Sequence, residues 1–350
     1  MDIHQLTILR ELGELGSVKA VAENLMVTPS AVSQHLAQLQ RGVPVPLTRR
    51  QGRTLVLTEA GEVLAEAGAD VVASMARART AIEAFHETPG AHVTVSGFHS
   101  AGQALFAPLV RTLAARHDDG TPGPTVSFTD EDVAQQDFPA LAARYDLVLA
   151  HRLEHRPPWP TGRVSVIELA REPLDVAVPS DHPLAARDVL EAADVAHEPW
   201  VTSRPGYSPD DVLSAIAAMA STPVKIVHRI NDYSTVASLV AEGGTLGLLP
   251  RYTSRTALGS SPRTGDGVVL RPLRGLNTRR CIDLLARPES LERASVRAVA
   301  DAFRKVMDDL VADGYQSSIS TPGKRASSSS SSPQGSPVGS SPSKTPPKSG

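Results

Sequence analysis

The stretch that decides the fold of the N-terminal region is Ser17–Gln40, SVKAVAENLMVTPSAVSQHLAQLQ. Ser17 is a good N-cap for a first short helix, and residues 26–27 form a tight turn. Thr28-Pro29 then supplies a second N-cap, followed by proline at the first helical position. Two short helices joined by such a turn predict a helix-turn-helix.

The second of these helices has one apolar and one polar face. Val32, Leu36 and Leu39 point inward, whereas the outward positions are short, polar and nearly uncharged. Side chains of this kind hydrogen-bond base edges and phosphates in a major groove. The residues that we expect to contact DNA from this helix are Thr28, Pro29, Ser30, Ser33, Gln34 and Gln38.

The segment that follows, residues 47–57, predicts a β-hairpin with its turn at Gln51-Gly52. Its basic side chains would reach phosphates or a minor groove. These side chains are Arg49, Arg50 and Arg53. With a further helix before Ser17, on which Leu6, Leu9 and Leu12 share one face, the pattern predicts a winged helix-turn-helix over residues 1–58. A three-helix bundle with a solvated basic loop is the alternative.

A long helix follows, from about residue 59 to residue 86, capped by Thr58. Apolar residues recur along it with heptad spacing and form one seam, which is interrupted by Gly68. Such a seam needs a partner, most simply a second copy of the chain, although packing on the body of the same chain is the alternative. The residues assigned to dimerisation are Leu64, Val71, Met75, Ala78, Ile82 and Phe85, and Pro89-Gly90 ends this linker region, 59–90, with a hinge.

From His92 onward the pattern becomes an alternation of strands and helices, which predicts an α/β body over residues 91–316. We expect two subdomains with crossing strands. The expected strands are 93–96, 125–130, 146–150, 164–169, 174–178, 200–203, 225–230 and 245–249. The expected helices are 102–116, 234–242 and 290–312.

The N-terminal motifs resemble the DNA-binding head of LysR-type transcriptional regulators. The resemblance is carried, without gaps, by Ser17–Gln40, Val45-Pro46-Leu47, Arg50, Gly52-Arg53 and Leu57–Gly61. The chain departs from the family pattern at Gln40, where Glu is usual, at Pro44, where Gly is usual, and at Thr48-Arg49, where an apolar-acidic pair is usual. A weaker resemblance to the effector domain of the same family is carried by Glu172–Pro179 and Val240–Arg251.

This resemblance implies a two-lobed effector domain similar to periplasmic binding proteins. Lobe I would comprise residues 92–162 and 267–312, and lobe II residues 163–266. The resemblance also implies a regulator that binds double-stranded promoter DNA as a homodimer or homotetramer, responds to a small-molecule effector, and contacts RNA polymerase if it is an activator.

In such a fold the effector lies beyond the carboxyl ends of strands, near helix N-termini. Hydroxyl groups there suit a polar or anionic molecule, and an arginine can pair with its carboxylate. The residues assigned to this site are Phe98, Ser100, Ala101, Thr129, Arg152, Thr202, Ser203, Arg204, Ser234 and Arg251. Taken singly, Ser100 and Ser234 are equally consistent with plain N-caps, and each arginine with a surface ion pair.

An enzyme is the alternative from a different functional class. The run Gly97–Gly102, GFHSAG, resembles the nucleophile elbow of α/β hydrolases, with Ser100 as the nucleophile. However, Phe98 stands where that motif has glycine, and the last histidine, His228, falls in an expected strand. Phosphate-loop, dinucleotide and zinc-protease motifs are absent, and the eleven histidines show no metal-ligand spacing. We therefore expect no catalysis, cofactor or metal.

Composition completes the sequence-based expectations. The 350 residues include a single cysteine, Cys281, which excludes an internal disulfide and a cysteine-based zinc site. The net charge of −3 divides into +2 over residues 1–58, −9 over 59–316 and +4 over 317–350, so a basic head precedes an acidic body. The last segment is rich in Ser and Pro, and we expect a disordered tail, with no specific role as the plain alternative. Neither a signal peptide nor a membrane span is evident, which favours a cytoplasmic protein.

Overall fold

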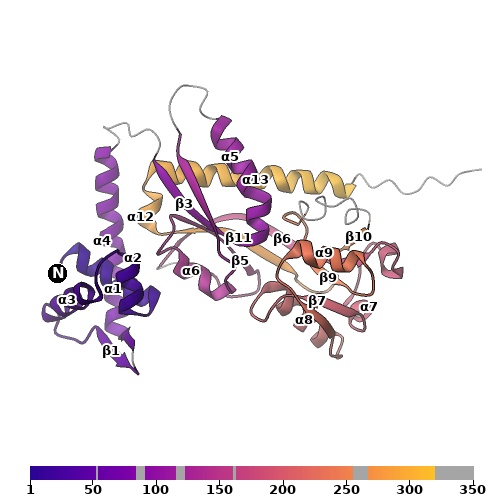
Figure 1. The fold of residues 1–350 in the computed structure, drawn as a ribbon, viewed down its shortest axis with the longest axis horizontal. Coiled ribbons are helices and arrows are strands. Elements are labelled where there is room, and N and C mark those ends of the chain that lie inside the picture. The colour runs from indigo at the N-terminus through magenta and orange to yellow at the C-terminus, as the bar shows by residue number, and fades with distance from the viewer. Residues whose placement is uncertain (53, 84–90, 116–122, 161–162, 255–266, 320–350) are drawn as a thin grey trace, which may run out of the picture.

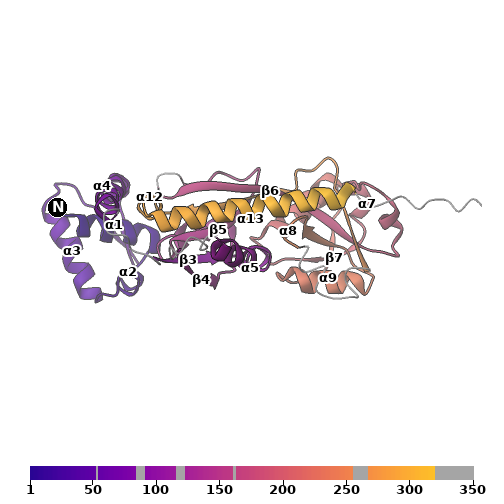
Figure 2. The ribbon, with the colours of Figure 1, turned by 90° about the horizontal axis from the view of Figure 1, so that it is seen from above.

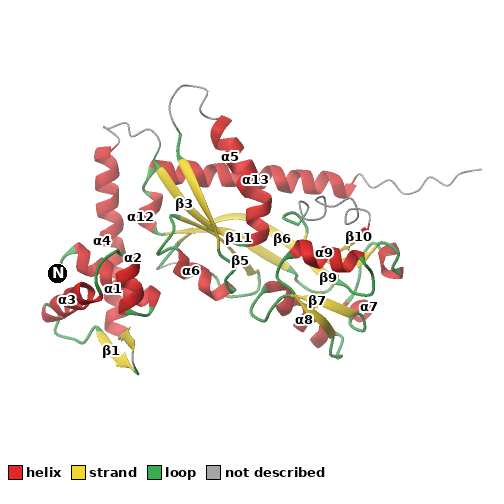
Figure 3. Ribbon diagram, in the orientation of Figure 1, coloured by secondary structure: helices red, strands yellow, loops and turns green. Residues whose placement is uncertain are grey.

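The computed structural model describes residues 1–52, 54–83, 91–115, 123–160, 163–254 and 267–319. A small helical head stands at one end, a long helix rises beside it, and an α/β body of two lobes extends away from both (Figure 1). The colouring in Figure 3 shows that the head is mostly helical and that most strands belong to the body. The predicted order, a winged helix-turn-helix followed by an α/β body, is confirmed.

The head is built from short helices and a hairpin. Its elements are α1 (Ile3–Leu15), α2 (Val18–Asn24), α3 (Pro29–Arg41), β1 (Thr48–Gln51) and β2 (Thr54–Leu57). The expected inward side chains form one buried core, in which Leu9, Val21 and Val32 are fully covered. The backbone at Gly61 passes so close to the hairpin that a Cβ there would lie 2.0 Å from the carbonyl oxygen of Leu47. Glycine at this position therefore fixes how the next helix meets the hairpin.

That next helix is α4 (Glu59–Glu83), which begins at Thr58, whose hydroxyl accepts a hydrogen bond from the Gly61 amide at 3.1 Å. One face of α4 packs against α1 and against α12 (Pro288–Leu291), a short helix of the body. This face carries small side chains, and Ala65, Ala69 and Ala73 are buried in it.

Lobe I contains the strands at one end of the large sheet, together with the helices that pack on them. Its strands are β3 (His92–Gly97), β4 (Thr125–Asp130), β5 (Leu147–Leu153) and β11 (Arg279–Ala286). Its helices are α5 (His99–Ala115), η1 (Gln135–Asp137), α6 (Phe138–Leu141), α12 and α13 (Ala294–Ile319). Figure 2 shows α13 running along the length of the body. Buried residues of β3, β5, β11, α5 and α13 form a single apolar core.

The strand β6 (Ser165–Pro179) joins the two lobes. Its first part pairs with β11 of lobe I, and its last part pairs with β9 (Gly247–Pro250) and β10 (Val268–Arg271) of lobe II. The seven-stranded sheet therefore has the order β10-β6-β11-β5-β3-β4, with β9 also on β6. Lobe II is completed by a two-stranded sheet and by helices: β7 (Pro199–Thr202), β8 (Lys225–Arg229), η2 (Pro183–Ala186), α7 (Ala192–Val195), α8 (Ser208–Met219) and α9 (Tyr233–Ala241).

The structure corrects several expected boundaries. The strands expected at 164–169 and 174–178 are one strand, because β6 continues through Pro173 from one lobe into the other. Residues 267–277, expected in lobe I, belong to lobe II, since β10 pairs with the lobe II part of β6 and Leu273 lies in a lobe II core. The helix expected over 290–312 is divided into α12 and α13, and α13 continues to Ile319, into the segment expected to be disordered.

Candidate functional site

Helix α3 exposes the polar face that the sequence predicted. Thr28 caps it, since its hydroxyl accepts a hydrogen bond from the Ala31 amide at 3.2 Å, and Pro29 takes the first helical position. All six of the residues assigned to DNA contact from this helix are solvent-exposed. The Ser33 hydroxyl donates to the carbonyl oxygen of Pro29 at 2.9 Å, so its lone pairs stay free to accept from a partner. The face can therefore offer donors and acceptors to base edges.

The hairpin beside α3 presents basic side chains. Strands β1 and β2 pair in register across the turn, where Gly52 adopts a positive φ of 61°. Arg49 and Arg50 are exposed, and Arg53 lies outside the described residues. Gln40 fixes the approach to this hairpin, because its amide donates to the carbonyl oxygens of Val43 and Val45 and its carbonyl accepts from the amide of Leu47 at 2.8 Å.

The apolar seam of α4 is largely exposed, although Met75 also lines a hollow beside Ile3 and Glu289. Val71, Met75 and Ile82 are 47%, 43% and 65% exposed, and Ala78 is exposed as well. Leu64 instead packs partly against the core of the head, and Phe85 lies outside the described residues. Helix α1 of the head and α12 of lobe I thus cover the alanine face of α4, and most of the seam stays exposed.

A charged cluster, which we call the lobe junction, lies where the two lobes meet. Arg280 on β11, 1% exposed, donates from Nη2 at 2.7 Å and from Nε at 3.0 Å to Oε2 of Glu172 on β6. The other oxygen of Glu172 accepts from the amides of Tyr252 and Thr253 just after β9. Arg280 also donates to the Thr253 hydroxyl at 2.9 Å and to that of Ser100 at 3.4 Å. These buried charges are thus fully compensated by partners from both lobes.

Aromatic rings and a histidine enclose the lobe junction. The guanidinium of Arg280 lies 5.2 Å from the ring centroid of Phe98 and 5.8 Å from that of Tyr233. The ring of His151, near the end of β5, is 4.6 Å from that of Phe98, and its Nδ1 lies 3.3 Å from the hydroxyl of Ser208. Burial, followed by the positive charge of Arg280, holds the pKa of His151 well below its usual range. His151 is therefore neutral at physiological pH.

A second charged cluster, the head contact, joins the head to lobe I. Arg287, directly after β11, pairs with Glu11 and with Glu14 of α1, at 2.7 Å in the latter case. Arg10 of α1 pairs with Glu289 of α12. Burial raises the pKa of Glu11, an effect that the nearby Arg287 opposes. The same strand, β11, thus carries Arg280 at one end and leads into Arg287 at the other.

Comparisons with known proteins identify the chain. A family model described as "LysR substrate binding domain" matches residues 86–308, and one described as "Bacterial regulatory helix-turn-helix protein, lysR family" matches residues 3–62. The chain belongs to the LysR family. It is accordingly a DNA-binding transcriptional regulator with an effector-binding domain.

Individual relatives are distant. The regulator is 26% identical over 253 residues to the "Uncharacterized HTH-type transcriptional regulator YybE" of Bacillus subtilis (strain 168), a match that covers 71% of this chain and 82% of that protein. It is 25% identical to the "DNA-binding transcriptional dual regulator OxyR" of Escherichia coli (strain K12), with 88% and 96% covered. Its fold is similar to that of full-length OxyR from Pseudomonas aeruginosa, solved as a cysteine-to-aspartate variant, with a TM-score of 0.58 at 18% identity and coverage of 87% and 98%.

The hydrolase alternative finds no support in this LysR-family regulator. Ser100 lies in the first turn of α5, which begins three residues earlier than expected, and its hydroxyl faces the guanidinium of Arg280. Among the described residues, no histidine is hydrogen-bonded to Ser100, and His228 is exposed on β8. The family consists of transcriptional regulators rather than enzymes. The described helices include none long and apolar enough to cross a membrane.

Apart from Arg152, the residues assigned to the effector site divide into four groups in the regulator. Phe98 and Ser100 contact Arg280, whereas Ala101 and Thr202 are buried, the first in the first turn of α5 and the second at the end of β7. Thr129 is exposed near the end of β4. The others are held by local partners: Ser203 accepts from the Asp210 amide, Arg204 pairs with Asp132, the Ser234 hydroxyl donates to Asp232, and Arg251 forms two bonds to Asp175.

The side chain of Arg152 points to the other face of β5 from the one that carries His151 of the lobe junction. Successive side chains of a strand point to opposite faces, so Arg152 lies on the face opposite to that of its neighbour His151. In the register, Arg152 stands opposite Cys281, whereas Leu153 stands opposite Arg280. The central residues of the lobe junction, Arg280 and Glu172, were not expected as site residues, because no strand was expected over 279–286. The two arginines at 279–280, directly before the mostly apolar run 281–286, are the sequence feature that could have predicted a strand with a charged start here.

Proposed function

We propose that this regulator reads promoter DNA with the exposed face of α3 in the major groove and the basic hairpin on the flanking backbone. The observation that carries the proposal is the exposed, polar and nearly uncharged face of α3 beside the exposed Arg49 and Arg50. Uncharged polar groups discriminate between base edges, and arginines at the hairpin add affinity that does not depend on sequence.

The regulator binds DNA as a dimer in this proposal, and α4 supplies the interface. Support comes from the exposed apolar seam of Val71, Met75 and Ile82, because a helix with an uncovered apolar stripe is stabilised by a second copy. Two heads also raise the affinity of a module whose formal charge is only +2. A two-fold dimer reads a partly symmetric site.

A polar or anionic small molecule binding at the lobe junction controls the response. Support comes from the composition of this cluster, in which Arg280, Ser100 and Thr253 bring donors together from both lobes. The hydroxyl of Thr202 is buried and has no hydrogen-bond partner among the described residues, so a polar ligand group would gain a bond there. A ligand that binds one arrangement of the lobes more tightly shifts the population toward it.

Fluorescence anisotropy with the double-stranded DNA upstream of the regulator's own gene tests the DNA proposal. Gln34→Ala should weaken binding to the specific site by about tenfold and leave binding to unrelated DNA unchanged. Arg50→Ala should weaken binding to every sequence and reduce the salt slope by about one. Arg304→Ala, on the exposed side of α13, is the control. A parent protein without sequence preference over about 50–200 mM salt contradicts the proposal.

Sedimentation equilibrium tests the dimer. Met75→Glu places a charge in the seam and should shift the protein to the monomer, whereas Glu66→Gln on the same helix but off the seam should leave the dimer intact. A dimer that withstands Met75→Glu places the interface elsewhere.

A further inference from the structure

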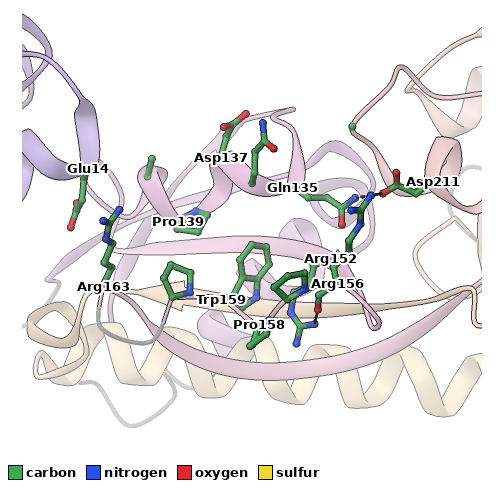
Figure 4. Close-up of a pocket in the computed structure, with 15 residues that line it drawn as sticks. Glu14, Gln135, Asp137, Pro139, Arg152, Arg156, Pro158, Trp159, Arg163 and Asp211 are labelled. Atoms are coloured by element: carbon green, nitrogen blue, oxygen red, sulfur yellow. Dashed lines mark hydrogen bonds and ion pairs between the residues drawn. The ribbon is translucent and has the colours of Figure 1, made fainter. Parts of the chain in front are cut away.

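A groove in the middle of the molecule is lined by all three parts of the chain. Its volume is about 560 Å³, within the range of small-molecule sites. Glu14 of the head lies at one end, Asp211 of lobe II lies at the other, and lobe I supplies the walls between them (Figure 4). The groove lies on the Arg152 face of β5, opposite to the His151 face. The ring of Phe138, 5.3 Å from that of His151 and 6.3 Å from that of Trp159, lies between the groove and the lobe junction.

The apolar part of the groove is rigid. The indole of Trp159 is 7% exposed, and its Nε1 donates to Oδ2 of Asp283 on β11 at 2.6 Å. Its ring is also in edge contact with Phe138, at a centroid distance of 6.3 Å. Around this ring the walls are formed largely by prolines, which have little conformational freedom to lose when a ligand binds: Pro139, Pro157, Pro158 and Pro160. These walls therefore lose little conformational entropy when a ligand binds.

The lining of the groove holds three arginines and three carboxylates, but they are not evenly paired. Asp211 is already held by Arg156 at 2.8 Å and by Gln135 at 3.1 Å, and Glu14 is held by the head contact. Arg152 has no such partner: its Nη1 donates to the carbonyl oxygen of Arg156 at 3.2 Å, its Nε is buried without a hydrogen bond, and no carboxylate in the described part of the chain reaches ion-pair distance.

The far end of the groove also carries an unpaired cation. Arg163 projects there beside Glu14 in Figure 4, and it forms no ion pair with a described carboxylate. The lining also contains one carboxylate, Asp137, that has no ion-pair partner among the described residues. Asp283, which holds Trp159, adds a second carboxylate: burial raises its pKa, and the nearby charge of Arg152 opposes that shift. The groove as a whole therefore has no clear excess of either charge, and what it offers an anion is the partly unbonded guanidinium of Arg152 beside an aromatic and proline surface.

We propose that this groove is a second ligand site, separate from the lobe junction, for a small organic anion with a flat apolar body. The apolar body lies against Trp159 and the prolines, and the acid group pairs with Arg152, whose guanidinium then gains the carboxylate that it lacks. Because Arg152 lies at the lobe II end of the groove, beside Asp211, the bound anion contacts both lobes and favours the arrangement in which they adjoin (Figure 4).

Fluorescence of Trp159 gives a direct test. The chain has two tryptophans, so in a Trp200→Phe variant of the full-length protein Trp159 is the only one. Titration with phenylacetate should change its emission in a saturable manner, and the neutral phenylacetamide should bind about tenfold or more weakly. Calorimetry with the parent protein should give the same affinity.

Matched variants localise the probe. Arg152→Gln should weaken phenylacetate binding about tenfold or more, and Ala140→Phe, which fills the groove without removing a charge, should do the same if the first variant folds poorly. Thr202→Val, outside the groove, should leave binding unchanged. The proposal is overturned if phenylacetate does not bind, if the amide binds equally well, or if Thr202→Val abolishes binding while Arg152→Gln does not. The DNA-binding assays are independent of each of these outcomes.

Discussion

The lobe junction and the head contact use the same chemistry at the two ends of β11, yet they differ in how completely their charges are satisfied. At the lobe junction, Glu172 accepts hydrogen bonds from Arg280, from the Thr253 hydroxyl and from two backbone amides. At the head contact, Nε of Arg287 and Oε2 of Glu289 have no hydrogen bond in the described structure, and Nε of Arg10 meets Oε1 of Glu14 only at 3.8 Å, although Glu11 is paired with Arg287.

This difference indicates distinct roles. A buried ion pair stabilises a structure only when further hydrogen bonds satisfy its remaining atoms, since otherwise the cost of removing the charges from water dominates. The lobe junction meets this condition and holds the two lobes together. The head contact does not, and separation of the head from lobe I returns its unsatisfied atoms to water. We therefore expect the head contact to open at a much lower free-energy cost than the lobe junction.

The largest expected effect follows from removing the junction arginine. Arg280→Met leaves the fully buried Glu172 without its main partner and should lower the free energy of unfolding by about 3–5 kcal/mol. Urea denaturation followed by circular dichroism measures this loss. A change below about 1 kcal/mol would show that the junction is not the stronger cluster.

The corresponding change at the head contact should cost less. Arg287→Met leaves Glu11 and Glu14 with only the more distant Arg10 as a charged partner, and the head can move away and hydrate them, so we expect a loss of only about 1–2 kcal/mol in the same assay. Adding Glu14→Gln to Arg287→Met should restore part of that loss. A loss that matches that of Arg280→Met contradicts the comparison.

Acidification should act on the two clusters with opposite signs. The pKa of His151 is lowered by burial, so below about pH 6.5 the unfolded chain binds a proton at this histidine while the folded chain does not. The free energy of unfolding therefore decreases as the pH drops below about 6.5. The pKa of Glu11 is raised by burial, so the docked head binds a proton more tightly than the free head, and docking strengthens as the pH falls toward the usual pKa of a glutamate.

These pH effects can be separated with two variants. His151→Asn should remove the part of the acid-dependent loss of unfolding free energy that comes from the junction, and Glu11→Gln should remove the pH dependence of head docking. Urea titrations and limited proteolysis at about pH 7 and about pH 5.5 measure the two quantities. A parent protein in which both move in the same direction would refute the assigned signs.

The smallest effect is expected at the exposed edge of the head contact. Arg77 of α4 lies 3.4 Å from Glu292, and the side chains are 54% and 29% exposed. Solvent screens such a pair, so Arg77→Ala should change the unfolding free energy by less than about 1 kcal/mol. A larger loss in urea denaturation would mean that the contact does not depend mainly on its buried arginines.

The head is the part of the fold that was predicted best, because short local sequence signals determine its helix ends and its turn. The caps at Ser17 and Thr28, the proline at 29 and the hairpin glycine at 52 each specify a local backbone conformation, and the structure has all four in the expected roles. The exposed seam of α4 was likewise readable from its heptad spacing.

The two clusters on β11 were not predictable in the same way. Arg280, Glu172 and Thr253 are far apart in the sequence and meet only because β6 crosses between the lobes and pairs with β11. Arg152 was grouped with Ser100 because both follow the expected pattern of strand ends, but the pleat of β5 turns Arg152 toward the groove. Such placements depend on tertiary register, which a single sequence does not specify.

The central claim is that the head contact is the weaker of the two clusters. The most direct test is to measure the distance between the head and lobe I. Nitroxide labels at Lys19→Cys on α2 and Lys305→Cys on α13, with Cys281→Ser and an excess of unlabelled chains, report this distance by double electron–electron resonance. We predict one narrow distribution for the parent, a broad one for Arg287→Gln, and a narrow one for Arg280→Gln under conditions in which it remains folded. A distribution that stays narrow in Arg287→Gln, or that broadens only in Arg280→Gln, would contradict the claim.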